Sequence, residues 1–284
     1  MAKNTNIQLR NKTIYQVHVR QYSKTSDFKG LTNDLERIKG LGVDIIYLLP
    51  IHPIGVLERK GLTGSPYAIS DYYEIDPLTG TLEDFIELIT KAHKLDMKIM
   101  IDIVFNHTSR DSVLTKEKPE WFYKKADGSF ANRVGDWSDI TDFDMSNKEV
   151  WTYLIDVLKY WAKYVDGFRC DVAPLLPKEF WEIARYEVDK IKNDMIWLTE
   201  SVEYSFIKYL RDEGYEASSD AEMYESFDIA YDYDIQPFLD GYLRGEMPLE
   251  RYLYEIYRQD VIYPKNYIKL RAFENHDIDR IANK

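Results

Sequence analysis

The chain has 284 residues, 45% of them hydrophobic, and a formal net charge of −12. A chain of this length and apolar content can bury roughly three quarters of its unfolded surface, which is enough for one large domain. Its negative charge repels nucleic-acid phosphates and acidic membranes, so it argues against both as partners and favours neutral or cationic ligands.

The lack of a recognisable signal peptide and the low cysteine content both point to a reducing compartment. The N-terminal stretch lacks the apolar core of a signal peptide, and no run of about 18 apolar residues follows it, so we predict a cytoplasmic protein. The one cysteine, Cys170, forbids an internal disulfide. It stands between Arg169 and Asp171 in a predicted strand. Alternation points its thiol to the opposite face, where we expect it to pack against helices.

Short apolar runs alternate with amphipathic stretches along the chain. An early helix is predicted from the apolar stripe Leu31, Leu35 and Ile38, and it ends near Gly40. Two later helices are predicted to begin with capping boxes at Thr81 and Ser146. The apolar runs are near-continuous, as strands buried on both faces require. They predict strands at residues 13–19, 43–50, 98–105, 165–171, 195–200, 226–232 and 267–273.

Repeated strand–helix units produce either a doubly wound sheet or a (β/α)8 barrel. A doubly wound sheet predicts a glycine-rich phosphate turn, and neither GxGxxG nor GxxxxGK[ST] occurs in the chain. We therefore predict an α/β fold, a TIM-type (β/α)8 barrel formed by a single domain over residues 1–284. The connections 51–80 and 106–145 follow the C-terminal ends of strands, where barrels carry their active sites. We expect the second to form a small inserted subdomain.

The number of predicted strands is one short of a closed barrel. Seven are predicted, and Asp277 is followed by only seven residues, too few for another strand and its helix. A sheet of seven strands would leave two unpaired edges, through which chains could self-associate. We expect the sequence to be the front part of a longer protein, with the barrel truncated after its seventh strand.

Three carboxylates fall where predicted strands run out, namely Asp171 in GFRCD, Glu200 in IWLTE and Asp277 in AFENHD. Strand ends share one face of a parallel barrel, so these residues could meet around one small molecule. Such a set suits glycoside chemistry, which needs a nucleophile and a proton donor about 5–5.5 Å apart in the retaining mechanism. Arg169 lies on the same strand face as Asp171 and could hold that carboxylate ionised.

Together with DIVFNH (102–107), the segments GFRCD (167–171), LTE (198–200) and FENHD (273–277) resemble the four catalytic segments of the α-amylase superfamily of glycoside hydrolases. Their order and their strand placement match as well. The segments SPYAISDYYEIDP, LLPIHPIG and TIYQVHVRQYS extend the resemblance over essentially all of residues 13 to 280.

The resemblance implies a role for each of the three carboxylates. Asp171 would be the nucleophile, and Glu200 the general acid, with a pKa raised by burial and by neighbouring carboxylates. Asp277 would bind sugar hydroxyls and stabilise the positively charged transition state.

The resemblance also implies a set of substrate-binding residues. Tyr67 would stack on the reacting sugar ring, and His107 and His276 would hydrogen-bond its hydroxyls. Asp102 would orient Arg169 at the mouth of the barrel. Relatives that trim single glucoses often carry an acidic residue directly after this tyrosine, where the chain has Ala68. That departure speaks against trimming from chain ends and leaves internal cleavage, transfer and isomerisation open.

The chemistry requires no cofactor. Two histidines and Asp102 could suggest a metal site. However, metal-dependent barrel hydrolases usually carry a His-x-His pair on the first strand, and this chain supplies only His18. Many relatives use the position of Asn106 in a structural calcium site, but the sequence shows no complete ligand set for calcium.

We therefore predict a retaining glycoside hydrolase or transglycosylase that acts on α-glucosidic linkages of starch-like oligosaccharides through a covalent glycosyl-enzyme intermediate. Two alternatives stay open. The first is a non-catalytic amylase-like binding protein, although such proteins typically lose catalytic carboxylates and carry a membrane anchor. The second is a fragment of such an enzyme that cannot close its barrel and is inactive or partly folded alone.

Overall fold

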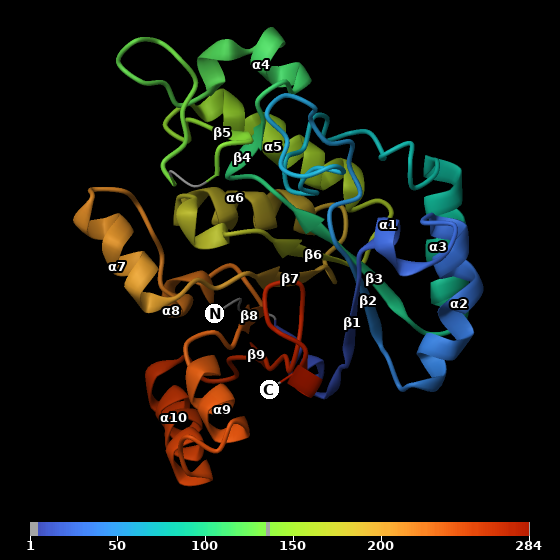
Figure 1. The fold of residues 1–284 in the computed structure, drawn as a ribbon, viewed down its shortest axis with the longest axis vertical. Helices are drawn as coiled ribbons and strands as arrows, with labels where there is room; N and C mark the ends of the chain where they lie inside the picture. The colour runs from blue at the N-terminus through green and yellow to red at the C-terminus, as the bar shows by residue number, and fades with distance from the viewer. Residues whose placement is uncertain (1–4, 135–136, 284) are drawn as a thin grey trace. The chain divides into compact units, whose positions relative to one another are not determined.

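A computed structural model describes residues 5–134 and 137–283 and divides the chain into two compact units (Figure 1). The N-terminal unit comprises Lys12–Asp171 and Ile183–Ile196. The C-terminal unit comprises Met1–Asn11, Val172–Glu182 and Trp197–Lys284. Parallel strands alternate with helices in each unit, as the sequence predicts.

The N-terminal unit carries a parallel sheet. Its strands lie in the order β1 (Ile14–Val17), β2 (Ile45–Leu48), β3 (Lys98–Ile103) and β6 (Gly167–Cys170). All residues of β2 and β6 are buried, which explains why the sequence shows near-continuous apolar runs instead of strict alternation. The register sets Asp102 of β3 opposite Arg169 of β6. Strand pairing alone therefore brings this acid and this base together.

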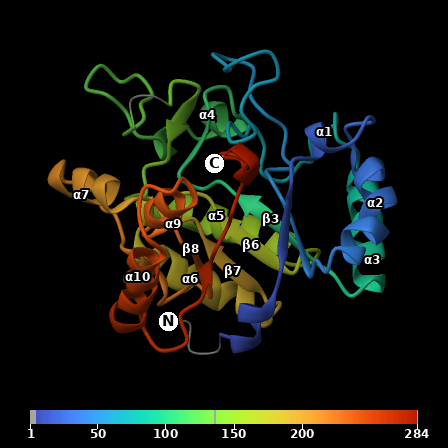
Figure 2. The ribbon, with the colours of Figure 1, turned by 60° about the horizontal axis from the view of Figure 1, so that its bottom comes forward.

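Helices α2 (Phe28–Gly40) and α3 (Leu82–Lys94) lie side by side in both views of the N-terminal unit (Figure 1, Figure 2). The Asp27 side chain caps α2 by accepting a hydrogen bond from the Gly30 N–H at 2.8 Å. Thr81 forms the predicted capping box of α3. Fully buried Phe28 and Phe85, with ring centroids 5.4 Å apart, join the two helices. Burial of each ring contributes about 1.5–3 kcal/mol.

The predicted start of helix α5 (Lys148–Trp161) is wrong by one residue. The sequence predicts a capping box at Ser146, but the N-cap is Asn147, whose side chain accepts from the Glu149 N–H at 3.0 Å. The Ser146 hydroxyl donates instead to Asp144 Oδ1 at 2.6 Å. Asn and Ser are about equally good N-caps, so the nearby aspartate decides between them.

The two long connections of the N-terminal unit are packed segments that extend from the same end of it (Figure 2). Residues 106–145 contain the antiparallel pair β4 (His107–Ser109) and β5 (Ile140–Asp142), helix α4 (Val113–Glu117) and a short turn of 3-10 helix (Pro119–Trp121). The Ser109 N–H donates to the Ile69 carbonyl at 2.8 Å, which fastens this segment to residues 51–80. Helix α1 (Val19–Tyr22) also belongs to this unit.

The C-terminal unit continues the pattern with parallel pairings of β7 to β8 and β8 to β9. Helix α6 begins in this unit and ends in the N-terminal unit, and the first residue of β7 belongs to the N-terminal unit. The strands are β7 (Ile196–Thr199), β8 (Ile229–Tyr231) and β9 (Lys269–Leu270). The helices are α6 (Lys178–Asp189), α7 (Tyr204–Asp212), α8 (Asp220–Met223), α9 (Gln236–Leu243) and α10 (Leu249–Ile262), with 3-10 turns at Ile7–Asn11, Ala173–Leu175 and Ile281–Asn283.

Packing in the C-terminal unit combines an apolar cluster with a buried ion group. Tyr224, Ala230, Tyr263 and Tyr267 form the cluster. Beside it, the fully buried Lys269 Nζ lies 2.5 Å from Asp220 Oδ2 and 3.1 Å from Asp234 Oδ1. The buried ammonium is tolerated because two carboxylates pair with it. Removing either carboxylate would leave the desolvation of the ammonium only partly compensated and would destabilise the fold.

All seven predicted strands are confirmed, and each is shorter than predicted. The shortening is greatest at β9, predicted over residues 267–273 but only two residues long. Cys170 is a free thiol that is fully buried, and burial raises its pKa. Over residues 5–134 and 137–283, no helix is long and apolar enough to cross a membrane.

Candidate active site

Arg169 joins two carboxylates at the strand ends of the N-terminal unit. Its Nη1 atom lies 2.9 Å from Asp102 Oδ1 and 2.9 Å from Asp171 Oδ1. The Arg169 and Asp102 side chains are wholly buried, and Asp171 is 7% exposed. A charge-assisted hydrogen bond favours the ionised form of its acceptor, so this contact fits the role that the sequence predicts for Arg169 beside Asp171.

Asp102 is surrounded by donors that leave it no access to solvent. Besides Arg169, the Tyr47 hydroxyl donates to Asp102 Oδ2 at 2.5 Å, and the Tyr67 hydroxyl donates to the same oxygen at 3.1 Å. The Tyr67 ring also faces the guanidinium, with Arg169 Cζ 5.8 Å from the ring centroid. Asp102 was predicted to orient Arg169, and its geometry fits that role. Because Asp102 is fully buried, it can influence a ligand only indirectly, by positioning half-buried Tyr67 or Arg169.

His107 lies on β4 and is almost completely buried, with 5% of its surface exposed. Burial lowers the pKa of His107 to about 4, so the imidazole is neutral near pH 7. A neutral ring can both donate and accept a hydrogen bond, which suits contact with a sugar hydroxyl. The Trp137 ring lies 5.5 Å from it, centroid to centroid.

Asn106 binds a guanidinium. Arg133 Nη2 donates to Asn106 Oδ1 at 2.7 Å, and Arg133 Nε lies 2.9 Å from Asp142 Oδ2. A metal cation at Asn106 would be repelled by the positive charge of Arg133. The residues around Asn106 therefore do not favour a metal site. Across the described residues, no group of three or more His, Cys, Asp or Glu side chains is placed to hold a metal ion. The absence of a cofactor requirement stays a prediction.

Glu200 directly follows β7 in the C-terminal unit and is 8% exposed. Its Oε2 atom accepts a hydrogen bond from the Val172 N–H at 2.7 Å. Val172 has φ +35° and ψ 39°, a left-handed conformation that is rare for a β-branched residue. This backbone strain aims the Val172 N–H at the carboxylate that the sequence assigns as general acid.

Asp277 lies in a loop well beyond the end of β9, so it does not directly follow a strand. Its backbone N–H donates to Asn275 Oδ1 at 2.7 Å, and His276 Nε2 lies 3.2 Å from Asp277 Oδ2. The Asp277 side chain is 48% exposed. The side chains of His276 and Asp277 are therefore in contact on a loop shaped by the Asn275 side chain, and their roles toward a substrate stay predictions.

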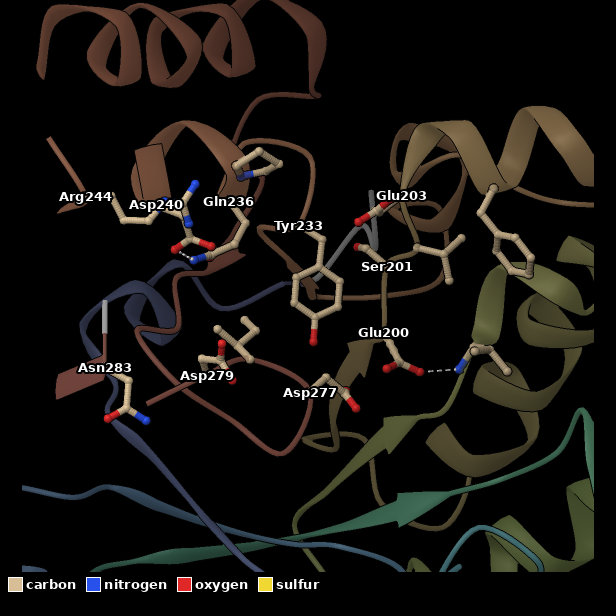
Figure 3. Close-up of a pocket in the computed structure, with 15 residues that line it drawn as sticks. Glu200, Ser201, Glu203, Tyr233, Gln236, Asp240, Arg244, Asp277, Asp279 and Asn283 are labelled. Carbon is tan, nitrogen blue, oxygen red and sulfur yellow. Dashed lines mark hydrogen bonds between the residues drawn. The ribbon is translucent and has the colours of Figure 1, made fainter. Parts of the chain in front are cut away.

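Glu200 and Asp277 open onto one pocket of about 770 Å³ in the C-terminal unit (Figure 3). The Tyr233 hydroxyl points toward both carboxylates and accepts a hydrogen bond from Asn275 Nδ2 at 2.9 Å. Burial raises the pKa of Tyr233, so the phenol keeps its proton. The pocket is lined by Val172, Glu200, Ser201, Val202, Glu203, Phe206, Tyr233, Gln236, Pro237, Asp240, Arg244, Asp277, Ile278, Asp279 and Asn283.

Sequence reasoning missed Tyr233, Val172 and Asn275. Tyr233 directly follows the predicted strand 226–232, so the rule that identified Asp171 and Glu200 could have found it. Asn275 lies inside the FENHD segment, although its hydrogen bonds link residues far apart in sequence. Val172 carries no signal, because nothing in a valine side chain indicates a left-handed backbone.

Comparison with known proteins identifies the same regions. A family model described as "Alpha amylase, catalytic domain" matches residues 20–138. The crystal structure of an alpha-amylase from Lactobacillus plantarum is 52% identical, with a TM-score of 0.96 over 98% of this chain and 66% of that chain. This agreement confirms the predicted TIM-type fold, of which the sequence given spans the first seven strands.

Two curated relatives differ in their named activity. The alpha-1,4-glucan:maltose-1-phosphate maltosyltransferase of Arcanobacterium haemolyticum is 34% identical over 59% of this chain. Alpha-amylase 3 of Dictyoglomus thermophilum is 30% identical over 72% of this chain. The matches span 27% and 42% of those two proteins, respectively, which is less than half of either.

Proposed function

We propose that this chain, which belongs to the α-amylase family, carries the catalytic residues of a retaining enzyme that cleaves α-glucosidic linkages in starch-like oligosaccharides. Hydrolysis and transfer to a second sugar share the mechanism. The observation that carries the proposal is the contrast between two carboxylates. Asp171 is bound by a buried guanidinium, whereas Glu200 is buried at the wall of a sugar-sized pocket.

The contrast assigns the two chemical roles. Asp171, ionised through Arg169, attacks the anomeric carbon and forms the glycosyl-enzyme bond as the bond to the leaving oxygen breaks. Glu200 gives its proton to that oxygen. In the second half of the reaction Glu200 takes a proton from water or from a sugar hydroxyl, whose oxygen then displaces Asp171. The mechanism needs the two carboxylates about 5–5.5 Å apart.

The remaining residues would bind the sugar and stabilise the charge that develops on it. Tyr67 offers a half-buried ring, held in place by Asp102, on which a sugar face could stack. Neutral His107 would hydrogen-bond hydroxyl groups without adding charge. Asp277, with His276 beside it, would attract the positive charge of the oxocarbenium-like transition state.

The preferred substrate is an internal α-glucan linkage. The net charge of −12 suits an uncharged polysaccharide, and Ala68 is buried and has no acidic group with which to grip a terminal ring. The named activities of the two curated relatives, an amylase and a maltosyltransferase, support α-glucan chemistry and leave the acceptor open between water and sugar.

Product analysis after incubation with maltooligosaccharides, trehalose and sucrose tests this proposal. We expect cleavage of the maltooligosaccharides with retained anomeric configuration, and loss of turnover in Asp171→Asn with the fold intact. Asp194→Asn, at a carboxylate that is 65% exposed, is the matched control and should behave as the unaltered protein. Substantial activity of Asp171→Asn on an activated α-glucoside, or inverted products, would refute the mechanism.

A further inference from the structure

Asn106, His107 and Asp142 form a buried polar group at the start of strand β4 in the N-terminal unit. Asn106 and Asp142 are each 1% exposed, and His107 is 5% exposed. The register of β4 against β5 sets His107 opposite Asp142. Asn106 Nδ2 lies 3.2 Å from His107 Nδ1 and 3.4 Å from Asp142 Oδ1. Because solvent hardly reaches these side chains, they must satisfy one another's hydrogen-bonding groups.

Arg133 connects this group to a fixed positive charge. Its backbone N–H donates to Asp142 Oδ2 at 2.8 Å, and its Nε donates to the same oxygen at 2.9 Å. Its Nη2 donates to Asn106 Oδ1 at 2.7 Å. The side chain of Arg133 is 17% exposed. Two contacts with Asp142 therefore hold Arg133 in place, and a third contact presents a donor to Asn106.

The contact with Arg133 determines which way the Asn106 amide faces. A guanidinium donates hydrogen bonds and cannot accept them, so the Asn106 atom that faces Arg133 must be the oxygen. The NH2 group is then the part of the amide that lies against His107 Nδ1. Since an NH2 group only donates, His107 Nδ1 accepts and carries no proton. Burial lowers the pKa of His107 to about 4, so the ring holds one proton near pH 7, and that proton is on Nε2.

We propose that Arg133 is a positioning residue for the reaction, which fixes the proton of His107 on Nε2 by holding the Asn106 amide in one orientation. The imidazole then offers a hydrogen-bond donor to a sugar hydroxyl, whose oxygen accepts. This inference rests on the proposed function, because it concerns the contact that His107 would make with the sugar. A ring that exchanged its two tautomers would present the donor for only part of the time, so the sugar would bind less tightly.

Nitrogen-15 NMR of the histidine rings of the whole protein at pH 7 locates this proton, and the signals of His107 are those that His107→Ala removes. We expect the proton on Nε2 in the unaltered protein. Asn106→Asp preserves the shape of the side chain and its contact with Arg133, but it replaces the NH2 donor by an acceptor. We expect this variant to protonate Nδ1. A proton on Nδ1 in the unaltered protein, or a bare Nδ1 in Asn106→Asp, would overturn the inference.

A double-mutant cycle shows whether Arg133 acts through His107. Arg133→Met should lower kcat/KM for maltotriose by about tenfold, because Asn106 Oδ1 loses its charged donor. In the His107→Ala background the same change should lower kcat/KM by less than about twofold, since no ring remains to be positioned. Arg110→Met is the matched control. Arg110 lies in the same connection and pairs with Glu58 at 3.0 Å, and its replacement should change kcat/KM little in either background.

Equal losses from Arg133→Met with and without the His107 ring would refute the inference, because an arginine that only stabilised the fold would act alike in both backgrounds. Thermal melting identifies a variant that does not fold, and the position of the proton in the unaltered protein then decides by itself. If the unaltered protein does not cleave maltotriose, the proposed function fails, and the NMR result still decides the inference. If it cleaves maltotriose while His107 carries its proton on Nδ1, the function stands and the inference fails.

Discussion

The backbone N–H of Val172 donates to Glu200 Oε2 across 2.7 Å, and it does so from a left-handed conformation with φ +35°. Val172 is the residue directly after Asp171 in the sequence. One short segment therefore supplies both the proposed nucleophile and the group that holds the proposed acid. The strained backbone is the structural cost of that arrangement.

Replacing Val172 by proline should remove the donor and force φ to about −65°, so Glu200 loses its fixed orientation. We expect kcat for maltooligosaccharide cleavage to fall by about a hundredfold or more, within the range typical of general acid–base catalysis. Val172→Ala keeps the N–H and should retain most of the activity. Circular dichroism and thermal melting of both variants would check the fold. Near-normal activity of Val172→Pro would show that the contact is dispensable.

Arg169 should be among the side chains on which stability depends most. Arg169→Met leaves two buried carboxylates, Asp102 and Asp171, without their shared cation, which typically costs about 3–5 kcal/mol. Urea denaturation would measure this loss. Arg37→Met provides the contrast, because Arg37 pairs with Asp34 at 2.6 Å but on an exposed surface, where such a pair contributes about 1 kcal/mol or less. Similar losses in the two variants would contradict the account.

Tyr233→Phe should reduce kcat/KM by about tenfold. The change leaves Asn275 Nδ2 without its acceptor and removes a protonated phenol beside Glu200 and Asp277. Steady-state kinetics on maltooligosaccharides would measure the effect. Tyr242→Phe, at an exposed tyrosine outside the pocket, should have no effect. A loss below about twofold in Tyr233→Phe would exclude the proposed contact.

Asp232 should make stability depend on pH in an unusual direction. Desolvation raises the pKa of Asp232 to about 6, although Arg271, Gln259 and Lys269 oppose the shift and Asp234 adds to it. The folded state therefore holds a proton that the unfolded chain, with a pKa of about 3.9, releases. This group stabilises the fold below about pH 4 and loses its contribution as the pH rises through about 6.

Relative to the unaltered protein, Asp232→Asn should therefore have a free energy of unfolding that is larger (a more stable fold) at pH 7 than at pH 4, by on the order of 3 kcal/mol. Denaturation at the two pH values would measure the difference. Asp127→Asn should change in the opposite direction, because hydrogen bonds from Ser129 lower the pKa of that exposed carboxylate. A pH-independent effect of Asp232→Asn would refute the assigned shift.

The sequence predicted the parts of the fold and site that depend on periodicity and on strand ends. The seven parallel strands were located but the antiparallel strands β4 and β5 were not, and the pairing of Arg169 with Asp171 followed from alternation along one strand. Ser146 failed as a cap because Asn147 is an equally good one, and its own hydroxyl bonds Asp144. Propensity cannot choose between neighbours that differ only in their local hydrogen bonds.

Features that depend on backbone conformation or on distant partners were beyond sequence reasoning. The left-handed backbone of Val172 and the hydrogen bond from Asn275 to Tyr233, 42 positions away, produce no periodic pattern in the sequence. The single domain, the cytoplasmic location, self-association through sheet edges and the roles of Asp171, Glu200 and Asp277 stay predictions. Each of these concerns the behaviour of the protein in solution or toward a substrate, which neither a residue pattern nor a fold measures directly.

The account depends most on Asp171 as the residue that forms the covalent bond to the sugar. A 5-fluoro-α-glucosyl fluoride traps such intermediates, and mass spectrometry of the digested protein locates the adduct. We predict one fluoroglucosyl group on the peptide that contains Asp171, and none in Asp171→Asn. An adduct on any other residue, or turnover with inverted configuration and no adduct, would contradict the central claim.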